Sequence, residues 1–298
     1  MLEQVLKSYL EHICGKANVR ENESMRAHTT FGIGGPAKFF VSVYKKDVLV
    51  RLVSALNYIE YPYKIIGTGS NLLVRDGGFD GVIIRLKTCE IVENGNIIYA
   101  DAGAPLVSVV QKAAELGLSG LEFAYGIPGT VGGAVFGNAG AFGASIADVA
   151  VVIDVLKDGE IISMENKDCK FGYRTSYFQK NKDIVILGAY FSLQHGDSDK
   201  IKAKMQVNLG KRNLSQPAGK TAGCVFRNQP AVSAGEVIDR LGLKGFRIGG
   251  AVISEKHANF IVNDNHATAK DVEKLIRHIK KRASDTYGIK LKLEIEKL

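Results

Sequence analysis

The chain is poor in cysteine and has no closely spaced pair of cysteines. Only four occur among 298 residues, and no two of them stand in a C-x-x-C arrangement. Thiols scattered in this way argue against a disulfide framework and against a zinc site. Unpaired thiols are typical of a reducing compartment, so we expect a cytoplasmic protein. The four are Cys14, Cys89, Cys169 and Cys224.

Long apolar runs and metal-ligand spacings are missing as well. Because no apolar run is long enough to cross a bilayer, we expect no membrane insertion. Charged residues interrupt the N-terminal stretch MLEQVLKSYLEH, which is typical of an amphipathic helix and not of a signal peptide. The six histidines are scattered, and we expect neither a metal site nor a catalytic histidine.

Basic residues exceed acidic ones, 39 against 31, which gives a net charge of +8. This excess favours anionic partners: nucleic acid, an acidic membrane or phosphorylated small molecules. The lysines are dispersed and the aromatic residues do not alternate with one basic stripe, which argues against nucleic acid. A nucleic-acid-binding protein remains the alternative from another class, and its binding would weaken steeply with salt. No protein partner can be identified from the sequence.

Strand and helix patterns are mixed without a regular βαβ rhythm, so the sequence predicts the α+β class. The length and the apolar content of 46% indicate a packed protein of two or three domains. The C-terminal IKLKLEIEKL alternates strictly, which predicts a strand with one apolar face. Other strands are expected at 37–44, 64–67, 71–74, 81–86, 96–103, 149–157, 160–164 and 183–194, and helices at 47–59, 105–116, 195–212 and 268–287.

Two short motifs look like nucleotide-binding fingerprints but lack the elements that should surround them. FGIGGPA at 31–37 contains G-x-G-x-x-A, yet a strand is expected after it where the dinucleotide motif needs a helix. GKT at 219–221 has Leu214 where a phosphate-binding loop needs its first glycine. We therefore expect a turn at the first motif and no NTPase loop at the second.

The most unusual segment is GIPGTVGGAVFGNAGAFG at 126–143, which we call the glycine stretch. It holds seven glycines in 18 positions, and no charged residue occurs from Phe123 to Ala147. A second loop, GTGSN at 67–71, has a similar composition. Both offer backbone N–H groups beside short polar side chains, and such groups bind oxyanions without formal charge. From this chemistry alone, a diphosphate site and tight turns in a small-residue core remain equal alternatives.

Six motifs in this order resemble the UDP-N-acetylenolpyruvoylglucosamine reductase family, and together they span nearly the whole chain. The second and third are shared with the wider flavoprotein superfamily of vanillyl-alcohol-oxidase type, whereas the last three are particular to the reductase. The motifs are TFGIGGPA at 30–37, GTGSNLLV at 67–74, the glycine stretch, GYRTSYF at 172–178, AGCVFRNQP at 222–230 and LKLEI at 291–295.

The resemblance implies a two-subdomain FAD-binding fold of vanillyl-alcohol-oxidase (PCMH) type and a C-terminal α+β substrate domain. We expect the FAD-binding region at 1–198, with subdomains at roughly 1–64 and 65–198, and the substrate-binding domain at 199–298. Neither glycine loop contains histidine or cysteine, so we expect non-covalent FAD. The cofactor-binding residues implied are Gly67, Thr68, Gly69, Ser70, Asn71, Leu72, Pro128, Gly129, Thr130, Gly132, Gly133, Asn138 and Gly140.

The resemblance also implies a reaction. In the family, NADPH reduces FAD, and the flavin passes hydride to the outer vinyl carbon of UDP-N-acetylglucosamine enolpyruvate. A proton must reach the inner carbon, which yields UDP-N-acetylmuramate, a peptidoglycan precursor. Such a site needs a cation near the carboxylate, an acid and a polar partner for the enolate. By residue, the resemblance assigns these roles to Arg174, Cys224 and Glu294, respectively.

Cys224 stands where the family commonly has serine. A thiol with an ordinary pKa of about 8.5 is mostly protonated at neutral pH and is a stronger acid than a hydroxyl, so it can keep the role of proton donor. The resemblance further implies substrate contacts by Tyr173, Arg227 and Asn228. From its place beside Glu294, Lys292 is a candidate Coulomb partner for that carboxylate. The chain looks like the form of the family without an added tyrosine loop, and candidates for the substrate diphosphate are Lys244, Arg247 and Lys256.

Each assigned residue has a plainer interpretation outside its motif. Arg174 would be a surface arginine after a turn, Cys224 a small core residue, and Glu294 one charge on the solvated face of the last strand. Another flavin oxidoreductase of the same superfamily, with a different substrate, is the alternative within the enzyme class.

Overall fold

The computed structural model describes residues 2–298, which form two compact units built from alternating segments of the chain. The first unit contains the residues up to Arg20, then Phe39–Gly67 and Gly81–Lys211. The second contains Glu21–Lys38, Thr68–Asp80 and Arg212–Leu298. The domain boundaries expected near residues 64 and 198 stay a prediction.

Helical periodicity located the long helices within a few residues. These are α1 (Leu2–Cys14), α2 (Lys46–Tyr58), α3 (Leu106–Glu115), α5 (Ser198–Ser215) and α7 (Ala269–Tyr287). At the start of α7, Thr268 and Asp271 form a capping box, and Gly288 ends the helix with a φ of 66°. Two short helices were not expected, α4 (Val131–Gly137) and α6 (Ala234–Arg240).

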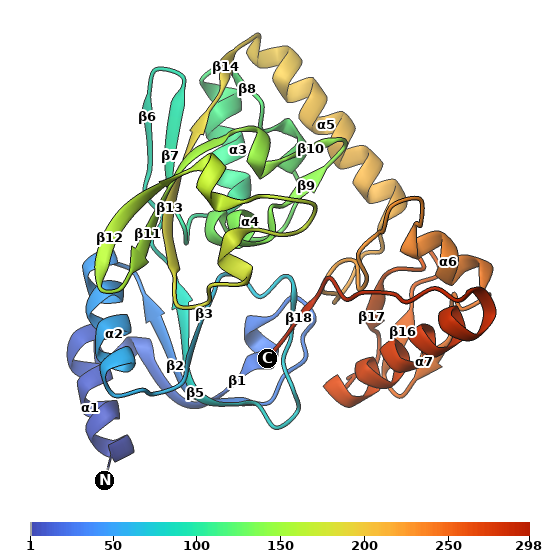
Figure 1. Cartoon of the computed structure of the whole chain (residues 1–298), viewed down its shortest axis with the longest axis horizontal. Helices are drawn as coiled ribbons and strands as arrows, with labels where there is room; N and C mark the ends of the chain where they lie inside the picture. Colours follow the sequence, from blue (N-terminus) through green and yellow to red (C-terminus); the bar gives the residue numbers. More distant parts are fainter. Residues whose placement is uncertain (1) are drawn as a thin grey trace. The chain divides into compact units, whose positions relative to one another are not determined.

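The first unit is built on a five-stranded antiparallel sheet of order β12-β11-β13-β7-β6 (Figure 1). The expected hairpin is confirmed, because Asp158 and Gly159 both have positive φ and join the two strands β11 and β12. The strands are β6 (Ile91–Asn94), β7 (Ile97–Asp101), β11 (Ala150–Lys157), β12 (Glu160–Glu165) and β13 (Val185–Ser192).

A four-stranded sheet has the order β1-β2-β5-β3, with β3 parallel to β5. Its strands are β1 (Val19–Ser24), β2 (Pro36–Val43), β3 (Tyr63–Ile66) and β5 (Phe79–Leu86). Buried side chains of β2 and β5 share one apolar core with α2 and α3. Burial of this surface is the main force that stabilises the unit. Two further short strands, β8 (Leu118–Ser119) and β14 (Gln194–His195), pair antiparallel.

The second unit contains a three-stranded sheet of order β15-β16-β17 with α7 packed against β15 and β16. Its strands are β15 (Arg247–Ile248), β16 (Ala251–Ile253) and β17 (Ile261–Asn263). The core includes Phe226, Leu275 and Ile295, each of them nearly or fully buried. The last strand, β18 (Glu296–Lys297), runs parallel to β4 (Leu72–Leu73), which directly follows the GTGSN loop.

The prediction that one face of the C-terminal segment is buried is confirmed, but the prediction that the segment forms one continuous strand was wrong. Leu291 and Ile295 are buried, whereas Lys290 and Lys292 are exposed. Regular pairing is confined to β18, and Leu293 makes only an isolated bridge to Phe226. Within residues 2–298, no helix combines the length and the apolar character of a membrane span.

Glu122 is a buried carboxylate that connects α5 to the segment before the glycine stretch. Its carboxylate accepts hydrogen bonds from the Ser119 hydroxyl at 2.7 Å and the Gly120 amide at 3.0 Å, and Lys204 Nζ lies 3.6 Å away. Burial by itself raises the pKa of Glu122, but these hydrogen bonds and the Lys204 charge hold that pKa below its ordinary value.

We expect Glu122→Gln to lower the free energy of unfolding by about 1–3 kcal/mol at pH 7, because the carboxylate has charge-assisted partners. Because folding lowers the pKa of Glu122, its ionised carboxylate stabilises the folded state, fully so at a pH above the unfolded pKa of about 4.3. This stabilisation is lost as the pH falls through the pKa of the folded state. The difference between the two proteins should therefore narrow below about pH 4.5. Urea denaturation from pH 7 down to about pH 3 measures this difference, and a constant difference would contradict the assignment.

Candidate active site

The glycine stretch folds into a turn, helix α4 and a small ribbon of β9 (Gly140–Ala141) and β10 (Ala144–Ser145). Thr130 caps α4, because its hydroxyl accepts a hydrogen bond from the Gly133 amide at 3.4 Å. At the other end, Asn138 adopts a left-handed φ of 44°. The Asn138 side chain donates to the Gly172 carbonyl and accepts from the Ala147 amide, both at 2.9 Å. These bonds give Asn138 a role in holding the loop.

Two of the predicted cofactor glycines are needed by the packing of the chain itself. A Cβ on Gly67 would collide with the Thr130 hydroxyl, so the start of the GTGSN loop lies directly against the glycine stretch. A Cβ on Gly132 would lie 2.9 Å from the Ala102 Cβ, and the Gly132 amide donates to the Ala102 carbonyl at 2.8 Å. Close approach of backbones therefore explains glycine at both positions.

One residue of the glycine stretch, in the first unit, and one of the GTGSN loop, in the second unit, each suit an oxyanion. Gly133 is exposed, and the nearest atom to a Cβ placed there would be the Thr130 hydroxyl at 3.7 Å, which is an ordinary contact. The chain itself therefore does not require glycine at this position: the space beside its Cα is open, while its amide makes a long hydrogen bond to the Thr130 hydroxyl. Thr68 has a buried hydroxyl without a hydrogen-bond partner in residues 2–298. An unsatisfied donor is costly, and a bound oxyanion would relieve that cost.

The GYRTSYF segment is held against the glycine stretch by side-chain hydrogen bonds to backbone carbonyls. Ser176 Oγ donates to the Phe136 carbonyl at 2.6 Å, and Gln179 Nε2 donates to the same carbonyl at 3.2 Å. Gln179 also donates to the Arg174 carbonyl at 3.1 Å. Ser176 and Gln179 were missed from the sequence, because single side-chain bonds to a distant backbone leave no periodic signal.

Arg174 occupies a constrained turn. Gly172 and Thr175 exchange backbone hydrogen bonds at 3.0 and 3.1 Å, and Arg174 between them has a φ of 53°. Such a left-handed conformation costs a non-glycine residue of order 1 kcal/mol and is concentrated at functional sites. Arg174 Nη2 donates to the Gly140 carbonyl at 2.7 Å, and its guanidinium carbon lies 5.3 Å from the Tyr173 ring centroid. The first unit therefore places Arg174 beside the glycine stretch, and Tyr173 is 57% exposed.

In the second unit, the segment 224–227 runs between two other segments. On one edge, Cys224 forms a bridge with Phe260, and the Val225 amide donates to the Asn259 carbonyl at 2.8 Å. On the other edge, the Glu294 amide donates to the Val225 carbonyl at 2.8 Å. Cys224 and Glu294, which are 70 positions apart in the sequence, are thus held in one hydrogen-bonded ladder. Both side chains are half-buried.

The end of the GTGSN loop joins this ladder. Asn71 Nδ2 donates to the Glu294 carbonyl at 3.2 Å, and the Glu296 amide donates to the Asn71 carbonyl at 2.9 Å. Leu72 then pairs with Glu296 as β4 begins. Gly69 has a φ of 67°, and a Cβ there would collide with the His28 carbonyl. Within the second unit, therefore, the predicted cofactor loop directly contacts the segment of Glu294.

The remaining predicted residues lie in these same segments. Ser70 and Gly129 are half-buried and Pro128 is exposed. The Arg227 amide donates to the Lys292 carbonyl at 2.9 Å, and Asn228 Oδ1 accepts from the Ala234 amide at 3.0 Å. The roles assigned to them stay predictions. Among residues 2–298, no group of three or more histidine, cysteine, aspartate or glutamate residues could hold a metal ion.

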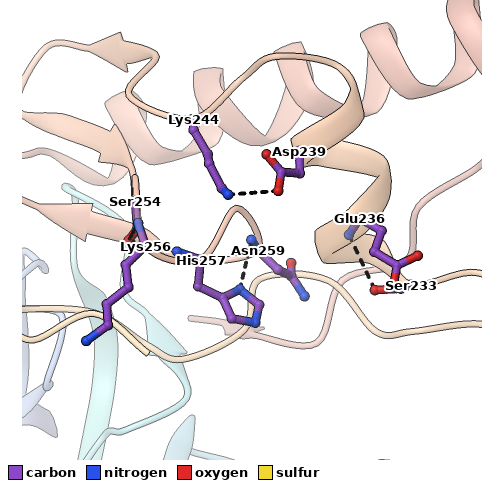
Figure 2. Close-up of polar contacts among 8 residues, drawn as sticks. All are labelled: Ser233, Glu236, Asp239, Lys244, Ser254, Lys256, His257 and Asn259. Carbon is purple, nitrogen blue, oxygen red and sulfur yellow. Dashed lines mark hydrogen bonds and ion pairs between the residues drawn. The ribbon is translucent and has the colours of Figure 1, made fainter. Parts of the chain in front are cut away.

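Each of the three basic candidates for the substrate diphosphate has a partner in the chain. Lys244 pairs with Asp239 at 2.7 Å, as Figure 2 shows, and Arg247 pairs with Asp264 at 2.6 Å. Lys256 donates to the Asn213 carbonyl. Exposed pairs of this kind exchange partners at little cost, so a contact with phosphate stays a prediction for all three.

Burial separates the cysteines. It raises the pKa of both Cys14 and Cys169 to about 11, whereas Cys89 is exposed. Because only the thiolate reacts, we expect Cys14 and Cys169 to resist a thiol reagent at pH 8 while Cys89 reacts first. Mass spectrometry of peptides after timed alkylation measures the order. Early modification of Cys169 in the folded protein would contradict this burial, and urea-unfolded protein is the control in which all four react.

Comparison with known proteins agrees with these features. A model described as "FAD binding domain" matches residues 37–165, and one described as "UDP-N-acetylenolpyruvoylglucosamine reductase, C-terminal domain" matches residues 215–298. The curated reductase of that name from Anoxybacillus flavithermus is 44% identical over 282 residues, which cover 93% of each chain. The reductase from Halalkalibacterium halodurans is 44% identical over 99% of this chain and 98% of its own length.

A solved structure is similar as well. The crystal structure of UDP-N-acetylenolpyruvylglucosamine reductase from Thermus caldophilus matches with a TM-score of 0.82 and 38% identity. The match covers 94% of this chain and 99% of that one. The family resemblance noted in the sequence motifs and the FAD-binding α+β fold are therefore confirmed. With these relatives matched over almost their full length, the chain belongs to the UDP-N-acetylenolpyruvoylglucosamine reductase family.

Proposed function

We propose that the chain is an FAD-dependent oxidoreductase that reduces UDP-N-acetylglucosamine enolpyruvate to UDP-N-acetylmuramate with NADPH, a step in peptidoglycan precursor synthesis. Relatives named for this activity match the chain over nearly its whole length. The structural observation that carries the proposal is the ladder that holds Cys224 and Glu294 together with the end of the GTGSN loop. Because the four cysteines are unpaired, which is typical of a reducing compartment, we place the protein in the cytoplasm.

The residues that would hold FAD are those of the two loops. The open backbone at Gly133, the unsatisfied Thr68 hydroxyl and the absence of charge in the glycine stretch suit a pyrophosphate held by amide and hydroxyl donors. When bound, FAD supplies hydride transfer from NADPH to the outer vinyl carbon of the substrate. The absence of histidine and cysteine from both loops supports non-covalent binding.

The chain's own residues would supply the proton and the charges. The Cys224 thiol gives its proton to the inner carbon, so hydride and proton together saturate the vinyl group and NADPH leaves as NADP⁺. Arg174 is always charged and can hold the substrate carboxylate in a bidentate contact as charge develops on it. Glu294 orients the extended enolate. Tyr173, Arg227 and Asn228 would contact the rest of the sugar nucleotide.

Anaerobic titration of the purified protein tests the function. We expect a yellow protein whose flavin band at about 450 nm bleaches with NADPH and returns when UDP-N-acetylglucosamine enolpyruvate is added. The control is UDP-N-acetylglucosamine, which lacks the vinyl group and should not restore the band. Bleaching without recovery would indicate another flavin oxidoreductase. A colourless protein that binds nucleic acid with steep salt dependence would favour the alternative from another class.

A further inference from the structure

Asn259 is buried, with 3% of its surface exposed, and its polar groups are used almost entirely on the segment that follows Cys224. Its carbonyl accepts from the Val225 amide at 2.8 Å, and its Oδ1 accepts from the Phe226 amide at 2.9 Å. Its Nδ2 donates back to the Phe226 carbonyl at 2.8 Å. A single residue therefore satisfies three backbone groups in two consecutive residues.

This arrangement requires a break in the regular pleat at Val225. In a regular strand, the amides of consecutive residues point to opposite edges, so only alternate amides can reach one neighbour. Here the amides of both Val225 and Phe226 reach Asn259. Such an irregularity, like a β-bulge, re-aims the adjacent side chains and often lies next to an active site. The residue immediately before the break is Cys224.

The opposite edge of the segment is fixed by regular pairing. The Glu294 amide donates to the Val225 carbonyl at 2.8 Å, and the Arg227 amide donates to the Lys292 carbonyl at 2.9 Å. Main-chain bonds thus set the position of Glu294 relative to this segment. On the edge that faces 257–260, Cys224 and the Val225 amide have main-chain partners, but both backbone groups of Phe226 are held by the Asn259 carboxamide instead of a main-chain partner.

Asn259 itself is held from behind by His257. The Asn259 amide donates to His257 Nδ1 at 3.2 Å (Figure 2), which requires that this ring nitrogen carries no proton. The ring also packs against Phe260, with 4.8 Å between ring centroids and an interplanar angle of 63°. The segment 257–260 is thus a rigid support with one carboxamide directed at the Phe226 backbone.

We infer that Asn259 is a positioning residue: its carboxamide maintains the break in the pleat after Cys224 and so fixes the direction of the thiol. The expected effect on the rate of flavin reoxidation rests on the proposed function. The expected effect on the direction of the Cys224 thiol does not, because it can be measured without substrate. Asn259 touches neither substrate nor cofactor in this role.

Rapid-mixing absorbance of the two half-reactions tests the catalytic consequence. In Asn259→Ala, we expect reoxidation of the reduced flavin by the enolpyruvyl sugar nucleotide to slow by about 10- to 50-fold, because a misplaced donor lowers the rate of proton transfer. Bleaching by NADPH needs no proton from Cys224 and should stay within about twofold. If the alanine variant does not fold, Asn259→Asp keeps the volume and the acceptor for the Phe226 amide, and it replaces the donor to the Phe226 carbonyl by a carboxylate oxygen that repels it.

Asn263→Ala is the matched control. Asn263 is also a buried asparagine of the second unit, with bonds from its side chain to the Phe31 carbonyl at 3.0 Å and from the Ala267 amide at 2.8 Å. These bonds join its side chain to residues outside segment 224–227, so its loss should lower stability without selective slowing of reoxidation. Equal slowing by both variants, or slowing of both half-reactions together, would show a general loss of structure and overturn the inference.

The rate at which iodoacetamide alkylates Cys224, followed by mass spectrometry in the absence of substrate, keeps the two proposals apart. Removal of the Asn259 carboxamide should change this rate by about fivefold or more relative to wild type and to Asn263→Ala, since thiol access and thiolate stability depend on direction. An unchanged rate would overturn the positioning role. Wild-type flavin that enolpyruvyl substrate cannot reoxidise would instead overturn the proposed function, and the alkylation result would still decide the role of Asn259.

Discussion

Replacement of Cys224 by alanine is expected to slow reoxidation of the flavin by the enolpyruvyl sugar nucleotide by about 10²- to 10⁴-fold, the usual contribution of a positioned general acid. Reduction by NADPH should stay within about twofold, because that step transfers hydride and needs no proton from the chain. Anaerobic stopped-flow absorbance resolves the two steps. The flavin content should match wild type, since Cys224 lies outside both glycine loops.

Cys224→Ser separates proton donation from packing. Serine keeps a donor of nearly the same size and should recover most of the rate that alanine loses, although its hydroxyl is a weaker acid than a thiol. Alanine and serine fill the site similarly, so a difference between their reoxidation rates measures the contribution of proton donation by residue 224. Reoxidation in the alanine variant at more than about a tenth of the wild-type rate would show that the proton comes from another group or from water.

Local signals in the sequence located most of the regular structure. The Thr268 cap, the Gly288 stop and the Asp158-Gly159 turn are decided within a few residues, and all three are as expected in the structure. The short helix α4 was hidden by its composition, because three of its seven residues are glycine. In the C-terminal segment, by contrast, a strand was predicted that the structure shows only in part. Its alternation indicates that one face is buried, but a regular strand also needs a neighbouring strand along its whole length.

The residues that hold the candidate site together could not be found in this way. Asn259, Ser176 and Gln179 act through side-chain bonds to backbone groups more than 30 positions away. Only the folded chain brings these partners together, and no periodicity or short motif marks them. Arg174, Cys224 and Glu294, by contrast, stand inside motifs that resemble a family, so they could be proposed before the fold was known.

The glycines of the GTGSN loop and the glycine stretch fit both of the interpretations that their composition left open, but at different positions. Gly67 and Gly132 are needed because the backbones of the chain approach one another closely. Gly133 and Gly137 have no such requirement, since a Cβ at the first meets only an ordinary contact and at the second meets nothing within 4 Å. Tight packing explains the first pair. Of the second pair, only Gly133 lies in the first turn of α4, so the question of an anion site falls on Gly133.

This division gives a prediction for Gly133→Ala. If the Gly133 backbone faces the pyrophosphate, an added methyl group holds the phosphate away, and lost hydrogen bonds to a charged group are worth about 1.5–3 kcal/mol each. We therefore expect the affinity for FAD to fall by about 100-fold. The stability of the apoprotein should stay unchanged or rise by up to about 1 kcal/mol, because alanine favours helix α4 over glycine.

Gly137→Ala is the matched control, because it places the same methyl group in the same helix and also in open space. It should give the same gain in apoprotein stability without the loss of FAD affinity. Fluorescence titration of deflavinated protein measures the affinity, and urea denaturation of the same preparations measures the stability. Equal FAD affinity in both variants would mean that the open backbone at Gly133 faces solvent, and the amides that hold a pyrophosphate would then have to be sought at Gly129 and Thr130, on the other side of the cap.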